Sequence, residues 1–367
     1  MFRQYKLRDY NFRLVLFVVA LSVIGYLAVG SAKESVQSKQ LYGILMGVFI
    51  MVVISLVDYS NILYFHWVLY VLNILLLIAV LVIGKEVNGA KRWINIGIQF
   101  QPSELAKILL ILFFAQFIMK KREKINRFSV ILTALLLLAI PLLLIFKEPD
   151  LSTSIVVVIC FCMMLFIGGL SYKFVLTVLG IMIPMGVAVF TIILTPGQSL
   201  LQGYQVNRIL AWLDPEKYAD STAYQQLNSI TAIGSGQLTG KGLNNNVIAS
   251  VKNGDFISEP QTDFIYAVIG EELGFVGGFA VIMLLLLIVW ECFRIARNAK
   301  DLAGSIIAGG VAALVGFQGF MNICVATGLL PNTGIPLPFV SYGLTSLVTL
   351  YMAVGIVLNI GLQSKKY

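Results

Sequence analysis

Ten stretches of the chain are long and apolar enough to cross a lipid bilayer, and this feature limits the fold more than any other. The hydrocarbon core is about 30 Å thick, so each crossing helix needs about 20 mainly apolar residues. With 59% hydrophobic and 12% charged side chains in 367 residues, the chain is too apolar for a water-soluble domain. The sequence predicts an all-α polytopic membrane protein, a single integral domain over residues 1–367, with spans near 12–30, 40–57, 64–83, 103–119, 129–146, 153–169, 174–194, 264–292, 303–328 and 341–362.

Clusters of lysine and arginine predict how these spans are oriented. They lie at the two ends of the chain and in alternate connections between the predicted spans, at 3–13, 120–127, 173, 294–300 and 365–366. The positive-inside rule places such clusters in the cytoplasm, together with both termini. This topology explains the net charge of +8, and no nucleic-acid partner is expected because the cations form no single basic face. The outer segments are then 31–39, 84–102, 147–152, 195–263 and 329–340.

Two of the outer segments are unlike ordinary linkers. The segment 195–263 is far longer than a usual connection, and such loops are often functional. Its amphipathic stretches Tyr204–Leu213 and Tyr224–Ile233 predict short helices at the membrane surface. The segment 329–340 is rich in proline and glycine, which predicts irregular backbone; at membrane depth this is tolerated only beside protein or a wet cavity. A cavity at the outer face is therefore expected.

The residue types present limit the chemistry. His66 is the one histidine, beside Trp67, so the chain lacks a Ser-His-Asp triad and an HExxH zinc site. The sequence also has no GxxxxGK[ST] loop, which argues against a transporter driven by ATP. Any general acid or base must come from a carboxylate, a lysine or a tyrosine.

Asp263 stands where the long outer segment meets the eighth span. An aspartate there is commonly a helix cap, and a catalytic base is the alternative. Carboxylates beside cations suit a site that takes a proton from a hydroxyl and accommodates a departing phosphate. The same face supplies both kinds of group, the acids Glu148, Asp150, Asp255 and Glu259 and the cations Lys91, Arg92, Lys147, Arg208 and Lys241.

Two neighbouring pairs of charged residues fall inside predicted spans, where a charge costs about 2.5–3.5 kcal/mol on insertion scales. Glu104 and Lys107 are three residues apart on one helix, close enough to pair. For this pair, a role in helix packing and a role in substrate binding both stay open. For Glu271 and Glu272 a structural role is favoured, because they lie deeper than the expected reaction surface.

Six motifs in the same order resemble those of the SEDS family, the shape, elongation, division and sporulation proteins typified by RodA, FtsW and SpoVE. The motifs are GAKRWINIG (89–97), QPSELAK (101–107), EPDLST (148–153), NSITAIGSGQLTGKGL (228–243), TDFIYAVIGEELGFVGG (262–278) and LLPNTGIPLPFVSYGLTS (329–346). The sequence departs from the family's motifs at a few loop positions: Gln261 precedes the TDF triplet, and Gln237 replaces a glycine. These differences concern the conformation of the loops. The short termini favour the RodA-like members.

The resemblance implies a peptidoglycan glycosyltransferase in the bacterial cytoplasmic membrane, which polymerises lipid II at the outer face. It implies that Asp263 is the essential acidic residue, the base that would take the proton of the acceptor hydroxyl, and that Asp255 is a second functional acidic residue. A divalent cation, Mg²⁺ or Mn²⁺, on Asp255 or Glu148 is a further expectation, and no organic cofactor is expected. Including the candidates from the outer face, the predicted substrate-binding residues are Lys91, Arg92, Trp93, Glu104, Lys107, Glu148, Asp150, Arg208, Lys241 and Asp255.

The predicted reaction is a single displacement with inversion, because an α-linked pyrophosphate is replaced by a β-1,4 bond. One base suffices for it. For Trp93, stacking on a sugar and anchoring at the membrane interface both stay open. The resemblance also implies a partner, a class B penicillin-binding protein with transpeptidase activity, in addition to membrane lipids. A lipid II flippase and a scaffold without activity are the alternatives; the concentration of charges at the outer end favours the polymerase.

Overall fold

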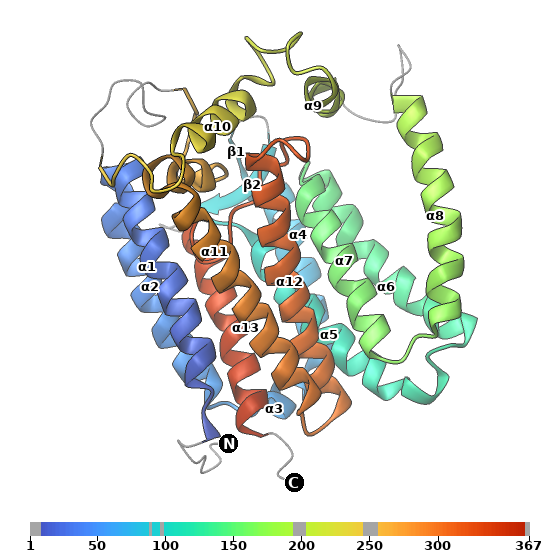
Figure 1. Ribbon diagram of the computed structural model, residues 1–367. Helices are drawn as coiled ribbons and strands as arrows, with labels where there is room; N and C mark the ends of the chain where they lie inside the picture. The colour runs from blue at the N-terminus through green and yellow to red at the C-terminus, as the bar shows by residue number, and fades with distance from the viewer. Residues whose placement is uncertain (1–8, 88–89, 96–98, 194–202, 245–255, 364–367) are drawn as a thin grey trace.

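The computed structural model describes residues 9–87, 90–95, 99–193, 203–244 and 256–363, and Figure 1 shows them as a helical bundle with a cap of shorter elements at one end. The helices are α1 (Phe12–Ala32), α2 (Glu34–Ser55), α3 (Tyr59–Tyr64), α4 (His66–Ile83), α5 (Pro102–Lys120), α6 (Phe128–Lys147), α7 (Leu151–Ile167), α8 (Tyr172–Ile193), α9 (Gly203–Leu213), α10 (Tyr224–Ser235), α11 (Ile265–Arg297), α12 (Leu302–Ala326) and α13 (Leu344–Leu362).

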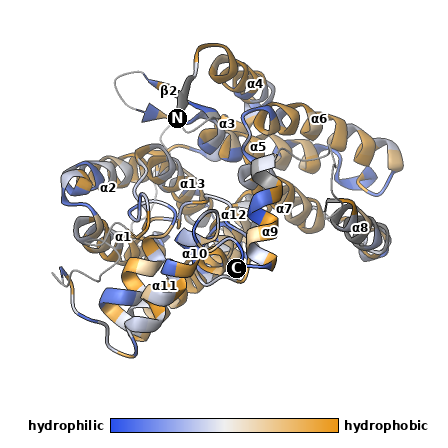
Figure 2. Ribbon diagram, turned by 90° about the horizontal axis from the view of Figure 1, so that it is seen from above, coloured by the Kyte–Doolittle hydropathy of each residue, from blue (hydrophilic) through white to orange (hydrophobic). Residues whose placement is uncertain are grey.

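The all-α membrane fold is confirmed. Among the described residues, eight helices are long and apolar enough to cross a membrane: α1, α2, α4, α5, α6, α11, α12 and α13. The shorter α7 and the peripheral α8 occupy the positions predicted for the sixth and seventh spans. Apolar runs become helices in lipid because a helix satisfies its backbone hydrogen bonds internally. Figure 2 shows α4 and α6 as hydrophobic over most of their visible length.

The bundle has two unlike ends. The ends of the described chain, near Asp9 and Gln363, lie together at one end, as an even number of crossings requires (Figure 1). The basic residues around Lys120 and Arg297 belong to helix ends on that same side. The opposite end carries α9, α10 and a small sheet. The predicted grouping of basic connections with the termini is therefore reproduced.

Two outer segments differ from the prediction. Segment 31–39 is not a loop, because α1 ends at Ala32 and α2 begins at Glu34, with Lys33 alone extended between them. The mainly polar residues 34–39 continue the helix beyond its apolar part, so hydropathy placed its start too late. Segment 84–102 contains a sheet that was not predicted, with antiparallel strands β1 (Lys85–Val87), β2 (Ala90–Asn95) and β3 (Gln99–Phe100) in the order β1-β2-β3.

The two short helices predicted in the long outer segment are confirmed as α9 and α10, and their position at the membrane surface stays a prediction. They lie over the end of α12, whose last carbonyl groups have no partner within the helix. The Gln226 amide donates to the carbonyl of Val325 at 2.8 Å, and the Ser229 hydroxyl donates to that of Ala326 at 2.7 Å. From α9, the Trp212 indole donates to the Gly328 carbonyl at 3.0 Å. The long outer segment is therefore fixed to the bundle by side chains that complete α12.

Helix α11 is broken at Gly274, where φ is 64° and ψ is −160°, a conformation that is essentially restricted to glycine. The break frees the next two amides from their partners one turn earlier in the helix. The Phe275 amide instead donates to the Gln237 carbonyl at 2.8 Å, and the Val276 amide donates to the Leu238 carbonyl at 3.1 Å. Residues 237–242, which we call the clasp, thus enter the break from outside.

The clasp also binds the carbonyl groups that the break releases. The amides of Lys241 and Gly242 donate to the carbonyls of Glu271 and Glu272, both at 3.0 Å. The Lys241 ammonium pairs with the buried Glu271 carboxylate at 2.8 Å, and the Ser31 hydroxyl donates to Glu272. Two lost helical bonds are therefore replaced by four bonds to the clasp. The clasp sets the direction of segment 265–273, which begins two residues after Asp263.

Candidate active site

Asp263 does not cap α11. The N-cap position is Phe264, and no side chain makes a capping bond there. The Asp263 backbone carbonyl accepts a hydrogen bond from the Asn322 amide at 2.7 Å. Its carboxylate faces Gly334, where a Cβ atom would lie 3.2 Å from Oδ2. Among the described residues no side chain donates to this carboxylate, and Asp263 is partly exposed.

Segment 327–343, which passes beneath Asp263, is irregular as predicted, and α12 holds it in place. The Asn322 amide donates also to the Ile335 carbonyl at 2.7 Å, and the Gln318 amide donates to the Pro336 carbonyl at 3.1 Å. The Ser341 hydroxyl donates to the Thr262 carbonyl at 2.6 Å. The irregular backbone therefore finds its hydrogen-bond partners in protein, as its depth requires.

Gln318 and Asn322 were not among the residues predicted from the sequence. Both are fully buried, and they lie four residues apart on one face of α12. A signal was available, because polar side chains inside an apolar span are costly and usually face the bundle interior. What the sequence alone did not indicate is that their partners are backbone carbonyls of a distant segment.

The predicted pair of Glu104 and Lys107 forms inside the bundle. The Lys107 ammonium lies 2.8 Å from Glu104 Oε1 and 2.9 Å from Gln318 Oε1, and both charged residues are at most 5% exposed. Through Gln318 the pair connects α5 to α12 and to Pro336. This burial favours a role in packing beneath the irregular segment over direct contact with substrate.

Two guanidinium groups come to Asp263 from separate elements. Arg92 on β2 donates from Nε to the Glu148 carbonyl at 3.0 Å and also donates to the Pro149 carbonyl. Arg208 on α9 donates from Nη1 to the Asn332 carbonyl at 3.3 Å. Each guanidinium donates to backbone carbonyls, and the positive charge of each acts on Asp263.

The electrostatic surroundings of Asp263 suit a general base. Burial raises the pKa of Asp263 to about 6, with Arg208 and Arg92 acting to lower it and with Asp150 and Glu259 acting to raise it. A base with a pKa close to the working pH combines ionisation with proton affinity. At neutral pH most Asp263 carboxyl groups are therefore ionised and can still accept a proton.

Two further predicted acids lie beside this site. Asp150 caps α7 by accepting from the Thr153 amide at 3.1 Å, and it accepts from Gln101 at 3.3 Å. Glu148 is fully buried, and neither carboxylate oxygen has a hydrogen-bond partner among the described residues. Burial and the Asp150 charge raise the pKa of Glu148 to about 9, against the opposing effect of Arg92. Glu148 is therefore a neutral acid at pH 7.

The remaining predicted substrate-binding residues are less closely associated with Asp263. On β2, Lys91 is exposed and Trp93 is half-buried, and strand alternation puts both on the face opposite Arg92. Lys241 is engaged by Glu271 in the clasp. Asp255 lies outside the described residues. Within the described part of the chain no three His, Cys, Asp or Glu side chains gather as metal ligands, so the divalent cation stays a prediction.

These features together define a class of protein: an integral-membrane enzyme with a carboxylate base between two fixed cations at one end of a helical bundle. Such an arrangement fits group transfer from an anionic lipid-linked donor to a hydroxyl. The chain belongs to the family described as Cell cycle protein, which groups FtsW, RodA and SpoVE, and whose model matches residues 9–366. The family membership expected from the six motifs is confirmed.

Known proteins of this family resemble the chain over nearly its full length. Stage V sporulation protein E of Bacillus subtilis is 35% identical, over 96% of this chain and 97% of its own. Peptidoglycan glycosyltransferase MrdB of Escherichia coli K12 is 36% identical, over 96% and 93%. The probable peptidoglycan glycosyltransferase FtsW of Geobacter metallireducens is 34% identical, over 98% and 96%.

Solved structures share the fold. A chain from the work titled "Structural coordination of polymerization and crosslinking by a peptidoglycan synthase complex" has a TM-score of 0.79 and 28% identity, covering 96% of this chain and 97% of its own. The Rod shape determining protein RodA of Thermus thermophilus has a TM-score of 0.72 and 26% identity, covering 98% of both chains.

Proposed function

We propose that this chain is a peptidoglycan glycosyltransferase that polymerises lipid II into β-1,4-linked glycan strands and releases polyprenyl pyrophosphate. The names of the relatives support the enzyme class. The observation that carries the assignment is the Asp263 carboxylate, which does not cap α11, is partly exposed and is influenced by the charges of Arg92 and Arg208. A scaffold without activity would not need a base with these surroundings.

The proposed reaction is one displacement. The 4-hydroxyl of an N-acetylglucosamine acceptor attacks the anomeric carbon of the donor N-acetylmuramic acid, and Asp263 takes the hydroxyl proton. As the new bond forms, the bond to the α-linked pyrophosphate breaks and its electron pair leaves with the phosphate. Arg92 and Arg208 stabilise the charge on this leaving group, since fixed cations act strongly where water is excluded. Inversion at the anomeric carbon gives the β-linkage.

The proposed location is the bacterial cytoplasmic membrane, with Asp263 at the outer face. The support is the distribution of charge, because the basic clusters gather at the bundle end that holds the described termini. The catalytic carboxylate lies at the other end. The polyprenyl chains of donor and product would stay in lipid beside the apolar helices.

The proposed partner is a class B penicillin-binding protein, whose transpeptidase would cross-link the new strands. The support is the similarity to a chain from a complex described as coordinating polymerisation and crosslinking. A divalent cation stays a separate proposal, and no step above depends on it. Its test is lipid II polymerisation in EDTA followed by addition of Mg²⁺ or Mn²⁺; equal product throughout would remove the proposal.

The central experiment is polymerisation of lipid II by the purified chain in detergent, with the transpeptidase partner present and the product read on a gel. Wild type should give polymer, whereas Asp263→Asn should reduce the rate by about 10²–10⁴-fold, the range for loss of a general base. Asp220→Asn is the matched control, because Asp220 is an exposed acid in the same outer segment. Full activity of Asp263→Asn would refute the assignment. No polymer from any variant, with lipid II transported across vesicles, would favour the flippase.

A further inference from the structure

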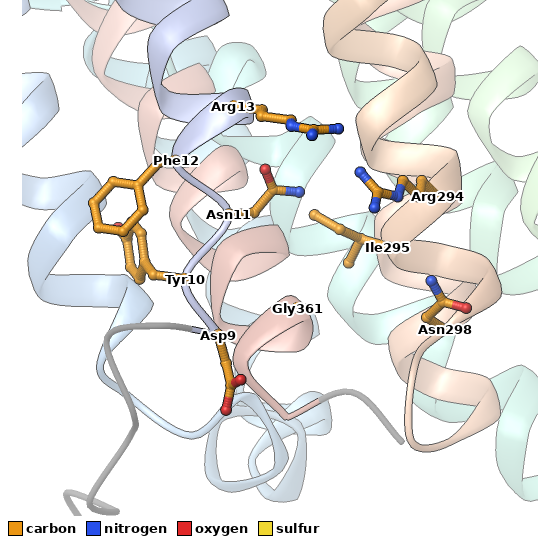
Figure 3. A pocket seen from close by; sticks show the side chains of 9 residues that line it. All are labelled: Asp9, Tyr10, Asn11, Phe12, Arg13, Arg294, Ile295, Asn298 and Gly361. Atoms are coloured by element: carbon orange, nitrogen blue, oxygen red, sulfur yellow. The ribbon is translucent and has the colours of Figure 1, made fainter. Parts of the chain in front are cut away.

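A cavity of about 440 Å³ lies at the end of the bundle opposite Asp263, where the start of α1 meets the last turns of α11 and α13. Arg13 and Arg294 line it, with Asn11, Asn298 and Tyr10 among its other residues. Figure 3 shows the two guanidinium groups pointing toward one another across the opening. Two like charges that converge on one space favour an anion between them.

The charges around this cavity are not all compensated within the protein. Arg294 lies 3.3 Å from the buried Glu291 carboxylate, which also accepts from the Asn11 amide at 2.9 Å, so Glu291 is satisfied from two sides. Among the described residues Arg13 has no ion-pair or hydrogen-bond partner. Asp9 lines the lower edge, and its carboxylate points away from the two guanidinium groups (Figure 3). The upper part of the cavity therefore retains positive charge.

An exposed apolar stripe leads to the cavity along α11. Leu286, Trp290 and Arg294 follow one another at intervals of four residues, so they share one face of the helix. Leu286 is 56% exposed and Trp290 is 68% exposed, and in a membrane these side chains meet lipid. On α1, Phe12 lines the cavity and is 62% exposed. A molecule with an anionic head in the cavity could thus lay its apolar part along the helices.

We propose that this cavity binds the headgroup of an anionic glycerophospholipid, with the phosphodiester between Arg13 and Arg294 and the acyl chains beside Trp290. A guanidinium presents several donors in a plane that matches phosphate oxygens. The orientation proposed above places the cavity in the cytoplasmic leaflet, where anionic lipids are recognised by basic pockets between helices. A free phosphate ion shares the headgroup chemistry, but it would leave the apolar stripe without a role.

The test is the thermal stability of the full-length protein in detergent, titrated separately with phosphatidylglycerol, phosphatidylcholine and inorganic phosphate. A ligand that binds the folded state raises the melting temperature in proportion to its occupancy. We expect phosphatidylglycerol alone to stabilise wild type. Arg13→Gln should weaken its apparent affinity by about ten-fold or more, since a hydrogen bond to a charged group is lost. Arg297→Gln is the matched control, because it removes one exposed arginine from the same helix end outside the cavity.

Three outcomes would overturn the proposal: equal phosphatidylglycerol affinity in wild type and Arg13→Gln, equal weakening by Arg297→Gln, or stabilisation by inorganic phosphate as strong as that by phosphatidylglycerol. The second would indicate diffuse attraction, and the third would indicate an ion site. The measurement needs neither a defined membrane orientation nor lipid II. Its failure is therefore distinguishable from failure of the proposed polymerase, which is read from glycan product in the same preparation.

Discussion

Gly240 offers a direct test of whether the clasp positions Asp263. Its φ is +81°, and a Cβ atom there would overlap the Glu272 carbonyl and lie 2.6 Å from the Gly274 amide nitrogen. Gly242, in the same clasp, has φ +92° with nothing within 4 Å of an added Cβ. Alanine at either position has a left-handed backbone, which costs about 1–2 kcal/mol. At Gly240 alone, overlap with backbone adds about 1–3 kcal/mol.

The comparison of Gly240→Ala with Gly242→Ala therefore isolates the close approach from the backbone conformation. In the same detergent, Gly240→Ala should unfold at a temperature several degrees lower than Gly242→Ala. Its kcat for lipid II polymerisation should fall further, because a shifted clasp changes the direction of segment 265–273 and displaces Asp263. A displacement of 1 Å at a reacting group can reduce the rate by about 10²-fold.

Two results would refute this reasoning. If both alanine variants lose the same stability and the same kcat, the close approach at Gly240 has no separate effect. If Gly240→Ala unfolds early and yet keeps the kcat of wild type, the clasp stabilises α11 without positioning Asp263. A change confined to KM would count equally against a role in placing the base.

Three further predictions concern charge. The rate of polymerisation should fall about ten-fold per pH unit below about pH 6, as Asp263 becomes protonated. In Arg208→Gln the fall should begin at higher pH, because a cation that lowers the Asp263 pKa is gone. Superimposable pH–rate profiles of wild type and Arg208→Gln would contradict this. Ionised Asp263 is destabilised by burial, so at pH 8 Asp263→Asn should be more stable to unfolding than wild type, by up to about 3 kcal/mol. The difference should shrink as the pH falls below about 6 and vanish below about pH 3, where the carboxyl is protonated in both folded and unfolded states. Lys107→Met should lose about 3–5 kcal/mol by leaving the buried Glu104 unpaired, whereas Lys107→Met with Glu104→Gln should recover most of it; a double variant as unstable as the single one would refute the packing role.

The positions of the spans were predictable because hydropathy and hydrogen bonding point to the same structure in lipid. Helix α12 was expected at 303–328 and is found at Leu302–Ala326, and α4 was expected at 64–83 and is found at His66–Ile83. The predicted start of α2 was wrong, since residues 34–39 are mainly polar and nevertheless helical. Hydropathy reports where lipid begins, and it does not report where a helix that leaves the lipid ends.

The candidate site was predictable as a set of residue types and much less as a set of contacts. Arg92, Arg208 and Asp263 were all selected from the sequence, although they come from three separate segments. Lys241 was selected on the same grounds, and the structure places it against Glu271 instead. The position of Lys241 in the sequence is equally compatible with a place near Asp263 and with a pair to Glu271. Only the path of the backbone decides between the two.

That path depends on contacts between glycines. Residues 244–261 separate the motifs at 228–243 and 262–278, yet a Cβ on Gly236 would overlap the Gly270 carbonyl, and one on Gly274 would overlap the Gly240 amide. Each motif alone predicts a turn or a break, and neither indicates that the two fit together. Their contact gives hydrogen-bond partners to the backbone groups that the break in α11 frees, the amides of Phe275 and Val276 and the carbonyls of Glu271 and Glu272. The first part of the helix, which begins two residues after Asp263, can therefore take a direction of its own while the second part continues as an apolar span.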